Sequence, residues 1–398
     1  MSFQDLDRLS LKISQLNEQG LLRQRRMTES PCQPQVRVNG QTLLAFNSND
    51  YLGLAAHPLV VAALREGATI HGAGSGASHL ISGHSQVHDA LEAVLGNMMA
   101  AHIPAAQALY FSSGYMANLG VLSALADLSK GDITFFSDAL NHASLIDGIR
   151  LARAPCHVYA HSDLQHLTEL LRDCGTGTKV VVSDGVFSMD GDIALAKELL
   201  RICEQQGAWL LIDDAHGFGV LGDTGAGLLQ HVGMRSEQII YMGTLGKAAG
   251  VAGAFVAAHA LFMDWMVQRA RPYIYTTAAP AALAHALLTS LQIMASDEGR
   301  QRRAHLTELI RAFSLLPMPQ TWQKMHSTTA IQPLVVGSNA AVLKASADLQ
   351  AHGIWVSAIR APTVPDNTAR LRFTLSAAHT LADLEQLKKA LLALHMPC

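Results

Sequence analysis

The chain has 398 residues, of which 49% are hydrophobic and 15% charged, and its formal net charge at pH 7 is −3. This composition predicts a globular protein of two or three domains with a large apolar core, and it argues against nucleic acid or an anionic membrane as a partner. The five cysteines lack metal-binding or disulfide spacing, so we expect a cytoplasmic protein with free thiols and no metal site. The acidic start is unlike a signal peptide, and no apolar stretch is long enough for a transmembrane helix.

The N-terminal segment predicts a helix followed by a hairpin. Leucines and isoleucines at roughly helical spacing indicate a helix over residues 1–26, closed by the basic cluster Arg23, Arg25 and Arg26. Two apolar runs within residues 36–46 flank Asn39-Gly40, a strong two-residue turn signal.

A further helix is expected from Pro58 to His71, and a glycine-rich loop follows at residues 72–78. This loop lacks the G-x-G-x-x-G spacing and follows a helix rather than a strand. A dinucleotide-binding fingerprint is therefore disfavoured, and a flexible loop that approaches a ligand or a second subunit is the alternative.

Strands and helices alternate from residue 107 to 257, which predicts a largely parallel sheet covered by helices on both faces. Polar residues follow the apolar strands 108–111, 179–182, 209–212 and 239–242. In open α/β sheets ligands bind outside the carboxyl ends of the strands. We therefore expect these four junctions to meet at one site.

The remainder of the chain changes character. Residues 258–295 look helical, with an interruption at Pro272 and Pro280, and a long helix is expected from Pro280 to about residue 315. The pattern after Pro317 and Pro319 is typical of a smaller α+β domain. We predict an N-terminal segment at residues 1–46, a large domain at 47–295 and a small domain at 296–398.

The junction residues together suit one cofactor. The helix start at Gly114 offers free N–H groups to a phosphate, and the Thr244 hydroxyl can join them. Asp213 follows a buried strand and needs a cationic partner, such as a protonated ring nitrogen. His216 can reach a ring hydroxyl, and Lys247 offers an amine to an aldehyde. A phosphate, an aldehyde and a basic ring nitrogen together describe pyridoxal phosphate.

Simpler interpretations remain open for each residue. Most lysines are solvated surface charges, so Lys247 alone would carry little weight. Asp213-Asp214 could be turn or cap residues. His142, after the apolar run 133–136, could stack on the cofactor ring or simply lie in a helix-capping segment.

The sequence resembles the fold-type I pyridoxal-phosphate enzymes and, more narrowly, the α-oxoamine synthases, which join an amino acid to an acyl thioester with loss of carbon dioxide. The resemblance covers nearly the whole chain. Its motifs are Asn47–Leu54, Gly74–Gly76, Ser113–Asn118, Gly185–Gly191, Asp213–Gly217, Thr244–Lys247, Ile359–Pro365 and Ala369–Leu375. It implies an α/β fold, with a large cofactor domain and a smaller α+β domain, and a pyridoxal phosphate cofactor. The last two motifs are most similar to the branch that joins L-alanine to a pimeloyl thioester, on CoA or acyl carrier protein, in biotin biosynthesis.

The resemblance also implies roles for individual residues. Lys247, Asp213 and His142 would be catalytic. The cofactor would contact a set drawn from five strand ends and from a partner subunit of a homodimer: Gly114, Tyr115, His142, Ser188, Asp213, His216, Thr244, Lys247 and Thr277.

The substrates would contact a second set, comprising Arg23, His142, Thr363 and Arg372, with Arg25 as an alternative to Arg23. Asp184 stands where the family often has glutamate, which leaves the catalytic groups intact. Two other functions stay open: a sister synthase that uses glycine or serine, and a non-catalytic scaffold subunit of the same fold. Retention of Lys247 argues against the scaffold.

Overall fold

The computed structural model describes residues 3–394, so the predicted free thiol of Cys398 lies outside the described residues. The chain forms two compact units: unit 1 comprises residues 1–49, 189–191 and 305–398, and unit 2 comprises residues 50–188 and 192–304. The boundaries expected after residues 46 and 295 lie close to the unit boundaries after residues 49 and 304, but the N-terminal segment and the small domain, predicted as separate parts, belong to one unit. Each unit is described by itself.

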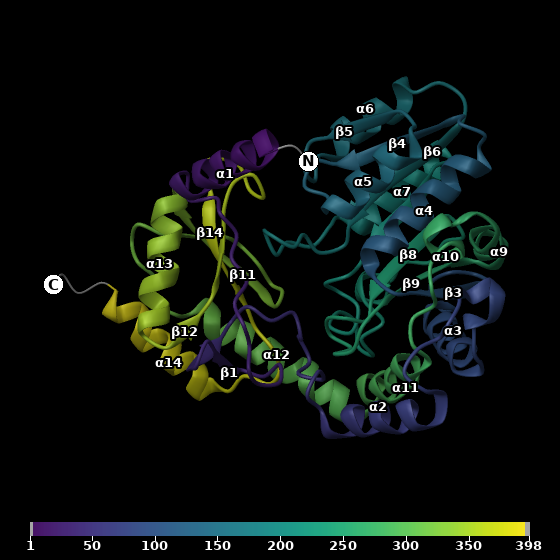
Figure 1. Cartoon of the computed structure of the whole chain (residues 1–398). Coiled ribbons are helices and arrows are strands. Elements are labelled where there is room, and N and C mark those ends of the chain that lie inside the picture. Colours follow the sequence, from purple (N-terminus) through teal and green to yellow (C-terminus); the bar gives the residue numbers. More distant parts are fainter. Residues whose placement is uncertain (1–2, 395–398) are drawn as a thin grey trace. The chain divides into compact units, whose positions relative to one another are not determined.

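Unit 2, all of which is described, is built on a seven-stranded sheet of order β3-β9-β8-β7-β6-β4-β5 (Figure 1). The strands are β3 (Ala106–Phe111), β4 (Ile133–Asp138), β5 (Cys156–Tyr159), β6 (Thr178–Asp184), β7 (Trp209–Asp213), β8 (Ile239–Thr244) and β9 (Ala254–His259). Strands β8, β7, β6, β4 and β5 run parallel, while β9 is antiparallel to both of its neighbours. The predicted mostly parallel sheet is confirmed.

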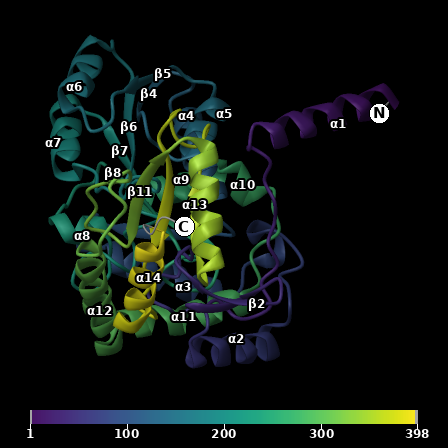
Figure 2. The same ribbon diagram turned by 90° about the vertical axis from the view of Figure 1, so that its left-hand side faces the viewer.

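Helices cover both faces of this sheet, as Figure 2 shows for α6 and α7 on one side and α4 and α5 on the other. The helices that begin in unit 2 are α2 (Pro58–His71), the single-turn π-helix η1 (His79–Gly83), α3 (Gln86–Met99), α4 (Gly114–Leu128), α5 (Ala143–Ala152), α6 (Leu164–Asp173), α7 (Ala196–Gln206), α8 (Leu228–Val232), α9 (Ala260–Arg269), α10 (Arg271–Ile274), α11 (Ala281–Ala295) and α12 (Asp297–Ser314). Because both faces are covered, every residue of β8 is buried, which explains its continuous apolar sequence.

The core of unit 2 places the strand ends firmly. Val182 of β6, Leu211 of β7 and Ile240 of β8 belong to one buried cluster together with Val121 and Leu125 of α4. Burial of side chains of this size contributes roughly 1.5–3 kcal/mol each. The loops at the carboxyl ends of these strands therefore start from a rigid base.

Three expectations about element boundaries are wrong. The helix expected from residue 280 to 315 is broken at Ser296, whose backbone is extended with φ −81° and ψ 177°. The N-terminal helix ends at Glu18, before Gly20 with its left-handed φ of 65°. Residues 254–259, partly assigned to a helix, form β9, because pairing with β3 and β8 outweighs local preference.

Unit 1 contains two small sheets, of order β1-β2-β12 and β10-β11-β14-β13. Its described elements are α1 (Phe3–Glu18), β1 (Gln35–Val38), β2 (Gln41–Ala45), β10 (Gln323–Lys324), β11 (Ile331–Gly337), α13 (Asn339–Ala351), β12 (Ile354–Trp355), β13 (Ser357–Ile359), β14 (Ala369–Thr374) and α14 (Leu381–Ala393). The predicted hairpin is confirmed: Asn39 and Gly40 both have positive φ, 46° and 78°, as its two-residue turn requires. Within residues 3–394, none of the helices has the length and apolar character needed to cross a bilayer.

Candidate active site

The carboxyl ends of five strands in unit 2 surround one cavity of about 190 Å³. Each of β3, β4, β6, β7 and β8, or the loop that follows it, contributes to the lining. The lining residues are Gly114, Tyr115, His142, Ser144, Asp184, Ser188, Asp213, Ala215, His216, Met242, Thr244 and Lys247. The prediction that the polar strand junctions meet is confirmed, and the junction after β4 joins them.

One side of the cavity suits an anion. Helix α4 begins at Gly114, and the side chain of its N-cap residue Ser113 accepts a hydrogen bond from the Met116 N–H at 3.3 Å. A Cβ on Gly114 would lie 3.4 Å from the Met242 methyl group, so glycine keeps this approach open. The buried Thr244 hydroxyl donates to the Gly253 carbonyl at 3.1 Å and presents its lone pairs on the same strand end. A helix N-terminus with such neighbours is a ready phosphate site.

Tyr115, the next residue, also lines the cavity. Its side chain is largely exposed, and its hydroxyl donates a 2.6 Å hydrogen bond to Asp147 on α5. This bond raises the pKa of the Tyr115 phenol and lowers the pKa of the Asp147 carboxyl. The ring of Tyr115 is thereby held at the edge of the cavity.

Asp213, at the end of β7, is buried and fully supported by donors. Its Oδ2 accepts a 2.7 Å hydrogen bond from Asn118 Nδ2, and its Oδ1 accepts one from the Ala215 N–H at 3.0 Å. Asn118 is itself completely buried on α4 and also donates to Ser144 at 2.9 Å. Two donors placed in this way hold the carboxylate in one orientation.

A second carboxyl group, Asp184 at the end of β6, lines the same cavity. Within the fully described unit 2, its Oδ1 has no hydrogen-bond partner. Burial, followed by the neighbouring Asp213 charge, raises the pKa of Asp184 well above its ordinary value. Two buried carboxyl groups, one with an unsatisfied oxygen, suit a cationic or proton-donating group in the cavity. A protonated ring nitrogen has that character, so the residues present fit pyridoxal phosphate.

Lys247 lies in the turn after β8 and is half-buried. Its Nζ is 2.8 Å from His216 Nε2, and the other ring nitrogen of His216, Nδ1, is 2.5 Å from the Tyr51 hydroxyl. These contacts form a chain from Tyr51 through His216 to the lysine amine. An imidazole in this position orients the amine and can exchange a proton with it.

His142 caps a helix and also lines the cavity. It is the N-cap of α5, with Nδ1 3.2 Å from the Ser144 N–H and 2.7 Å from the Ser144 hydroxyl, and it lines the cavity. Burial, with Lys247 in addition, lowers the pKa of His142, and Asp213 opposes this effect. The capping bonds hold a predominantly neutral ring at the cavity.

A histidine between two carboxylates anchors the loop that carries Ser188. His161 Nδ1 lies 3.0 Å from Asp138 Oδ1, and its Nε2 lies 2.9 Å from Asp192 Oδ2. These two hydrogen bonds raise the pKa of His161 to about 10, so the ring is protonated at neutral pH. Asp138 ends β4 and Asp192 follows the Ser188 loop, so the cation ties this loop to the sheet.

The remaining predicted site residues are Thr277 in unit 2 and three residues of unit 1. Within unit 2, Thr277 is exposed between α10 and α11 and does not line it. Arg23, Thr363 and Arg372 belong to unit 1, where Arg372 on β14 is buried and donates to Asn49 Oδ1 at 3.2 and 3.3 Å.

Arg23 and Thr363 are brought together in unit 1. Both line a cavity of about 610 Å³ with Leu16, Leu21 and Ile359, and among the described residues of this unit Arg25 does not line it. The apolar walls, together with the guanidinium groups of Arg23 and Arg360, suit an aliphatic chain that ends in a carboxylate.

Sequence reasoning assigned no role to Asn118, Ser144, Tyr51 or His161. An asparagine on the apolar helix that follows the Ser113–Gly114 turn was a usable signal for Asn118, because an amide buried in a helix needs a polar partner. Nothing in the local sequence around His161 reveals that it lies between two aspartates.

The comparisons with known proteins agree with this geometry. Residues 41–391 match the family model of aminotransferase class I and II. The chain is 59% identical to an 8-amino-7-oxononanoate synthase of Janthinobacterium sp. (strain Marseille), covering 96% of both chains, and 58% identical to one of Bordetella petrii, covering 97% of both.

Solved structures give the same picture. A serine palmitoyltransferase of Sphingomonas wittichii is similar with a TM-score of 0.87 and 27% identity, over 98% of this chain and 96% of that one. An 8-amino-7-oxononanoate synthase of Francisella tularensis is similar with a TM-score of 0.72 and 29% identity, over 89% of this chain and 99% of that one.

Proposed function

Because this chain belongs to the 8-amino-7-oxononanoate synthases, within aminotransferase class I and II, we propose that it joins L-alanine to a pimeloyl thioester on CoA or acyl carrier protein. Members of this family are pyridoxal-phosphate-dependent acyltransferases of biotin biosynthesis. In the proposed reaction a carbon–carbon bond forms between the alanine α-carbon and the acyl carbonyl carbon. Carbon dioxide and the carrier thiol leave. The observation that carries the proposal is the convergence of Lys247, His216, Asp213 and His142 in one cavity.

The cavity residues divide the work of holding the cofactor. Gly114, Tyr115 and Thr244 would hold the phosphate, and Asp213 would pair with the ring nitrogen. When bound, pyridoxal phosphate supplies an aldehyde for the amine and a ring that withdraws electrons. The Asn118 and Ala215 donors hold Asp213 in one orientation, so the ring nitrogen would meet a fixed carboxylate.

Three other residues act around the ring. His142 would stack on one face, and Ser188 and His216 would bond near the ring hydroxyl. Lys247 Nζ would take the α-proton of alanine, since its amine is oriented by His216 at 2.8 Å. Holding acid and base in place lowers the cost of the proton transfer.

The residues proposed to bind the substrates belong to unit 1. Arg372 would bind the alanine carboxylate, and its hydrogen bonds to Asn49 restrict the orientation of its guanidinium group. The cavity of Arg23 and Thr363 would take the pimeloyl chain, with the terminal carboxylate at the Arg23 guanidinium. An isolated apolar groove would not distinguish pimeloyl from a simple acyl chain, whereas a cation does.

We also propose that the enzyme is a homodimer of the cytoplasm. Exposed Thr277 lies outside the cavity of its own chain, which supports a role at the phosphate of a second subunit. A hydroxyl supplied across the interface would make each site incomplete in a monomer.

Product analysis tests the substrate assignment. Purified holoenzyme is given pimeloyl-CoA with L-alanine, glycine or L-serine, and each product is identified by mass spectrometry. We expect efficient release of carbon dioxide and formation of 8-amino-7-oxononanoate with alanine only. Preferential reaction with glycine or serine would contradict the proposal and indicate a sister synthase.

A lysine substitution tests the site itself. Lys247→Ala should remove turnover and the visible absorbance of the bound cofactor, while the exposed control Lys197→Ala should keep both. An active Lys247→Ala variant would refute the assignment of the catalytic amine. Loss of activity in both variants would instead point to misfolding, which thermal unfolding curves detect.

A further inference from the structure

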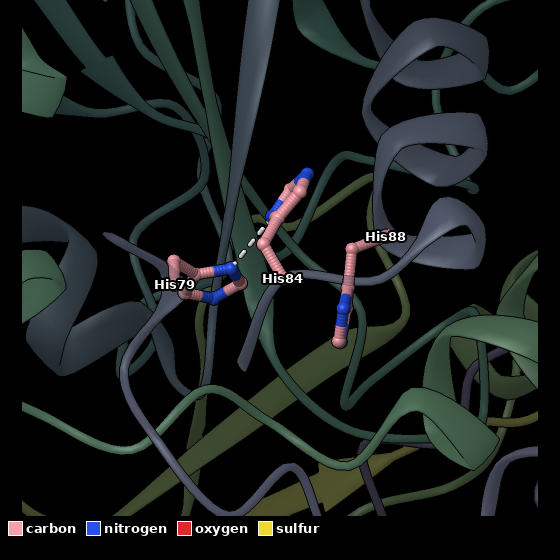
Figure 3. A group of neighbouring side chains, drawn as sticks. All are labelled: His79, His84 and His88. Atoms are coloured by element: carbon pink, nitrogen blue, oxygen red, sulfur yellow. Dashed lines mark hydrogen bonds between the residues drawn. The ribbon is translucent and has the colours of Figure 1, made fainter. Parts of the chain in front are cut away.

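Three histidines gather at the start of α3, away from the residues that line the active-site cavity. His79 begins η1, His84 follows its end, and His88 lies in the first turn of α3. One ring nitrogen of each lies within 4.8 Å of the others, and Figure 3 shows the three rings grouped together. No metal site was expected from the cysteine spacing, and these histidines had no predicted role.

The first pair already presents two nitrogens to one point. His79 Nδ1 and His84 Nδ1 are 2.8 Å apart, a hydrogen-bond distance (Figure 3). The other nitrogen of His84, Nε2, faces Asp89 Oδ1 at 3.8 Å. A carboxylate that accepts a hydrogen bond from the second ring nitrogen orients a metal-bound imidazole, and Asp89 has to move closer than 3.8 Å to do this.

The third histidine is fixed in a complementary way. His88 Nε2 donates a hydrogen bond to the Ala279 carbonyl at 2.8 Å, so Nδ1 carries the lone pair. That nitrogen accepts the Ser85 N–H at 3.1 Å and lies 3.0 Å from the Ser85 hydroxyl. A backbone carbonyl behind a histidine is the second common support for a metal ligand.

Two of the three histidines are shielded from solvent. His79 and His88 are buried, and the Tyr273 ring stacks on His79 with 4.5 Å between centroids and 6° between planes. These contacts hold the two buried rings in fixed positions.

Carboxyl groups stand beside the histidines. Asp89 and Glu92 form a second group with His84, again with one ligand atom of each within 4.8 Å. Carboxyl oxygens next to the imidazoles favour a divalent cation over an anion at this place.

From this geometry we propose that His79, His84 and His88 form a binding site for a divalent transition-metal ion of the zinc, nickel or cobalt class. Three imidazoles select such ions over magnesium and calcium, which prefer oxygen ligands. A tetrahedral zinc site has N–N separations of about 3.3 Å, given Zn–N distances of about 2.0–2.1 Å. The His79–His84 pair therefore has to widen from its 2.8 Å hydrogen-bond distance.

His84 is the ligand able to make this adjustment, because its side chain is 29% exposed while His88 is fully buried. At His88 the metal would replace the hydrogen bonds from Ser85. The bound ion would link η1, α3 and, through the Ala279 carbonyl, the segment before α11. It would therefore add stability to the fold without contacting the catalytic lysine.

The experiment uses the full-length protein loaded with pyridoxal phosphate. Zn²⁺ is titrated against a chromogenic zinc chelator, and thermal unfolding is followed with and without Zn²⁺. His84→Ala removes the partly exposed ligand, and His231→Ala, at an exposed position on α8, is the matched control. Both variants keep the cofactor and Lys247, so any binding of Zn²⁺ at the active site contributes equally to both.

We expect wild type and His231→Ala to bind one Zn²⁺ per chain and to gain thermal stability from it. His84→Ala should bind at least about tenfold more weakly, and Asp89→Asn should weaken binding by about tenfold through the His84 ring. Equal Zn²⁺ affinity in wild type and His84→Ala would overturn the proposal. So would an absence of binding in wild type. Unfolding temperatures of the metal-free variants confirm that each substitution leaves the fold intact.

Discussion

The contacts of His161 with two aspartates lead to a prediction about how the stability of the fold depends on pH. His161 bridges Asp138, at the end of β4, and Asp192, beyond the Ser188 loop, at 3.0 and 2.9 Å. His161→Gln removes the positive charge but keeps a side chain able to donate one hydrogen bond. The substitution therefore tests how much the positive charge at this position contributes to stability.

The size of the effect follows from the pKa of His161, which rises from 6.5 to about 10. A difference of that size corresponds to at most about 5 kcal/mol, since each pKa unit is worth about 1.4 kcal/mol. The side chain is 27% exposed. Because solvent screens the charge pair, we expect a loss of about 2 kcal/mol in the free energy of unfolding at pH 7.

The sign of the pH dependence is fixed by the direction of the shift. His161 binds its proton more tightly in the folded state, so its contribution is fully present below the unfolded value of 6.5. The contribution declines as pH rises and is lost as pH passes the folded value of about 10. The stability gap between wild type and His161→Gln should accordingly be large at pH 6–7 and small near pH 10.

Thermal unfolding of both proteins across this pH range measures the gap. The exposed control His231→Gln should follow wild type at every pH. A gap that stays constant from neutral to alkaline pH would show that no protonated histidine lies between the carboxylates. A gap that closes on acidification would show that the sign is reversed.

Three further predictions concern the active site. Asp213→Asn should fold but lose turnover by on the order of a hundredfold, because a neutral amide cannot hold a protonated ring nitrogen; near-normal exchange of the alanine α-proton with solvent would contradict this. Tyr51→Phe removes the 2.5 Å contact with His216 Nδ1 and should lower kcat/KM by about tenfold with unchanged cofactor content; unaltered kinetics would show that His216 is positioned without it. Arg23→Ala should raise KM for pimeloyl-CoA by about tenfold or more, whereas Arg25→Ala should change it little, and equal KM effects would remove the reason for assigning the acyl carboxylate to Arg23.

The local sequence pattern was sufficient to predict the strands that position the active-site residues. The apolar runs of β6, β7 and β8 are buried on both faces, so their continuous hydrophobicity marked them without a partner in view. Strand direction in a parallel sheet then requires their carboxyl ends to share an edge. Lys247, Asp213 and His216 were assigned by that argument together with the family resemblance, and the structure brings them into one cavity.

The ends of helices and strands were less predictable where local preferences and contacts with distant residues favour different structures. Ser296 sits in a helical pattern, yet the helix breaks there, and a Cβ on Gly299 would lie 2.2 Å from the Met294 carbonyl oxygen. Only the folded chain sets that close approach. β9 likewise depends on its pairing with β8 and with β3, and β3 is far away in the sequence.

The sequence by itself predicted the class of the fold, the cofactor and the lysine proposed to react with it, because the apolar strands, the polar residues that follow them and the family motifs all stand in the linear sequence. Only the tertiary structure decided which polar groups support them. Asn118 reaches Asp213, His161 reaches both Asp138 and Asp192, and their partners lie on different strands and loops. Distances between such side chains follow from how the elements pack, and packing depends on the whole chain rather than on any local pattern.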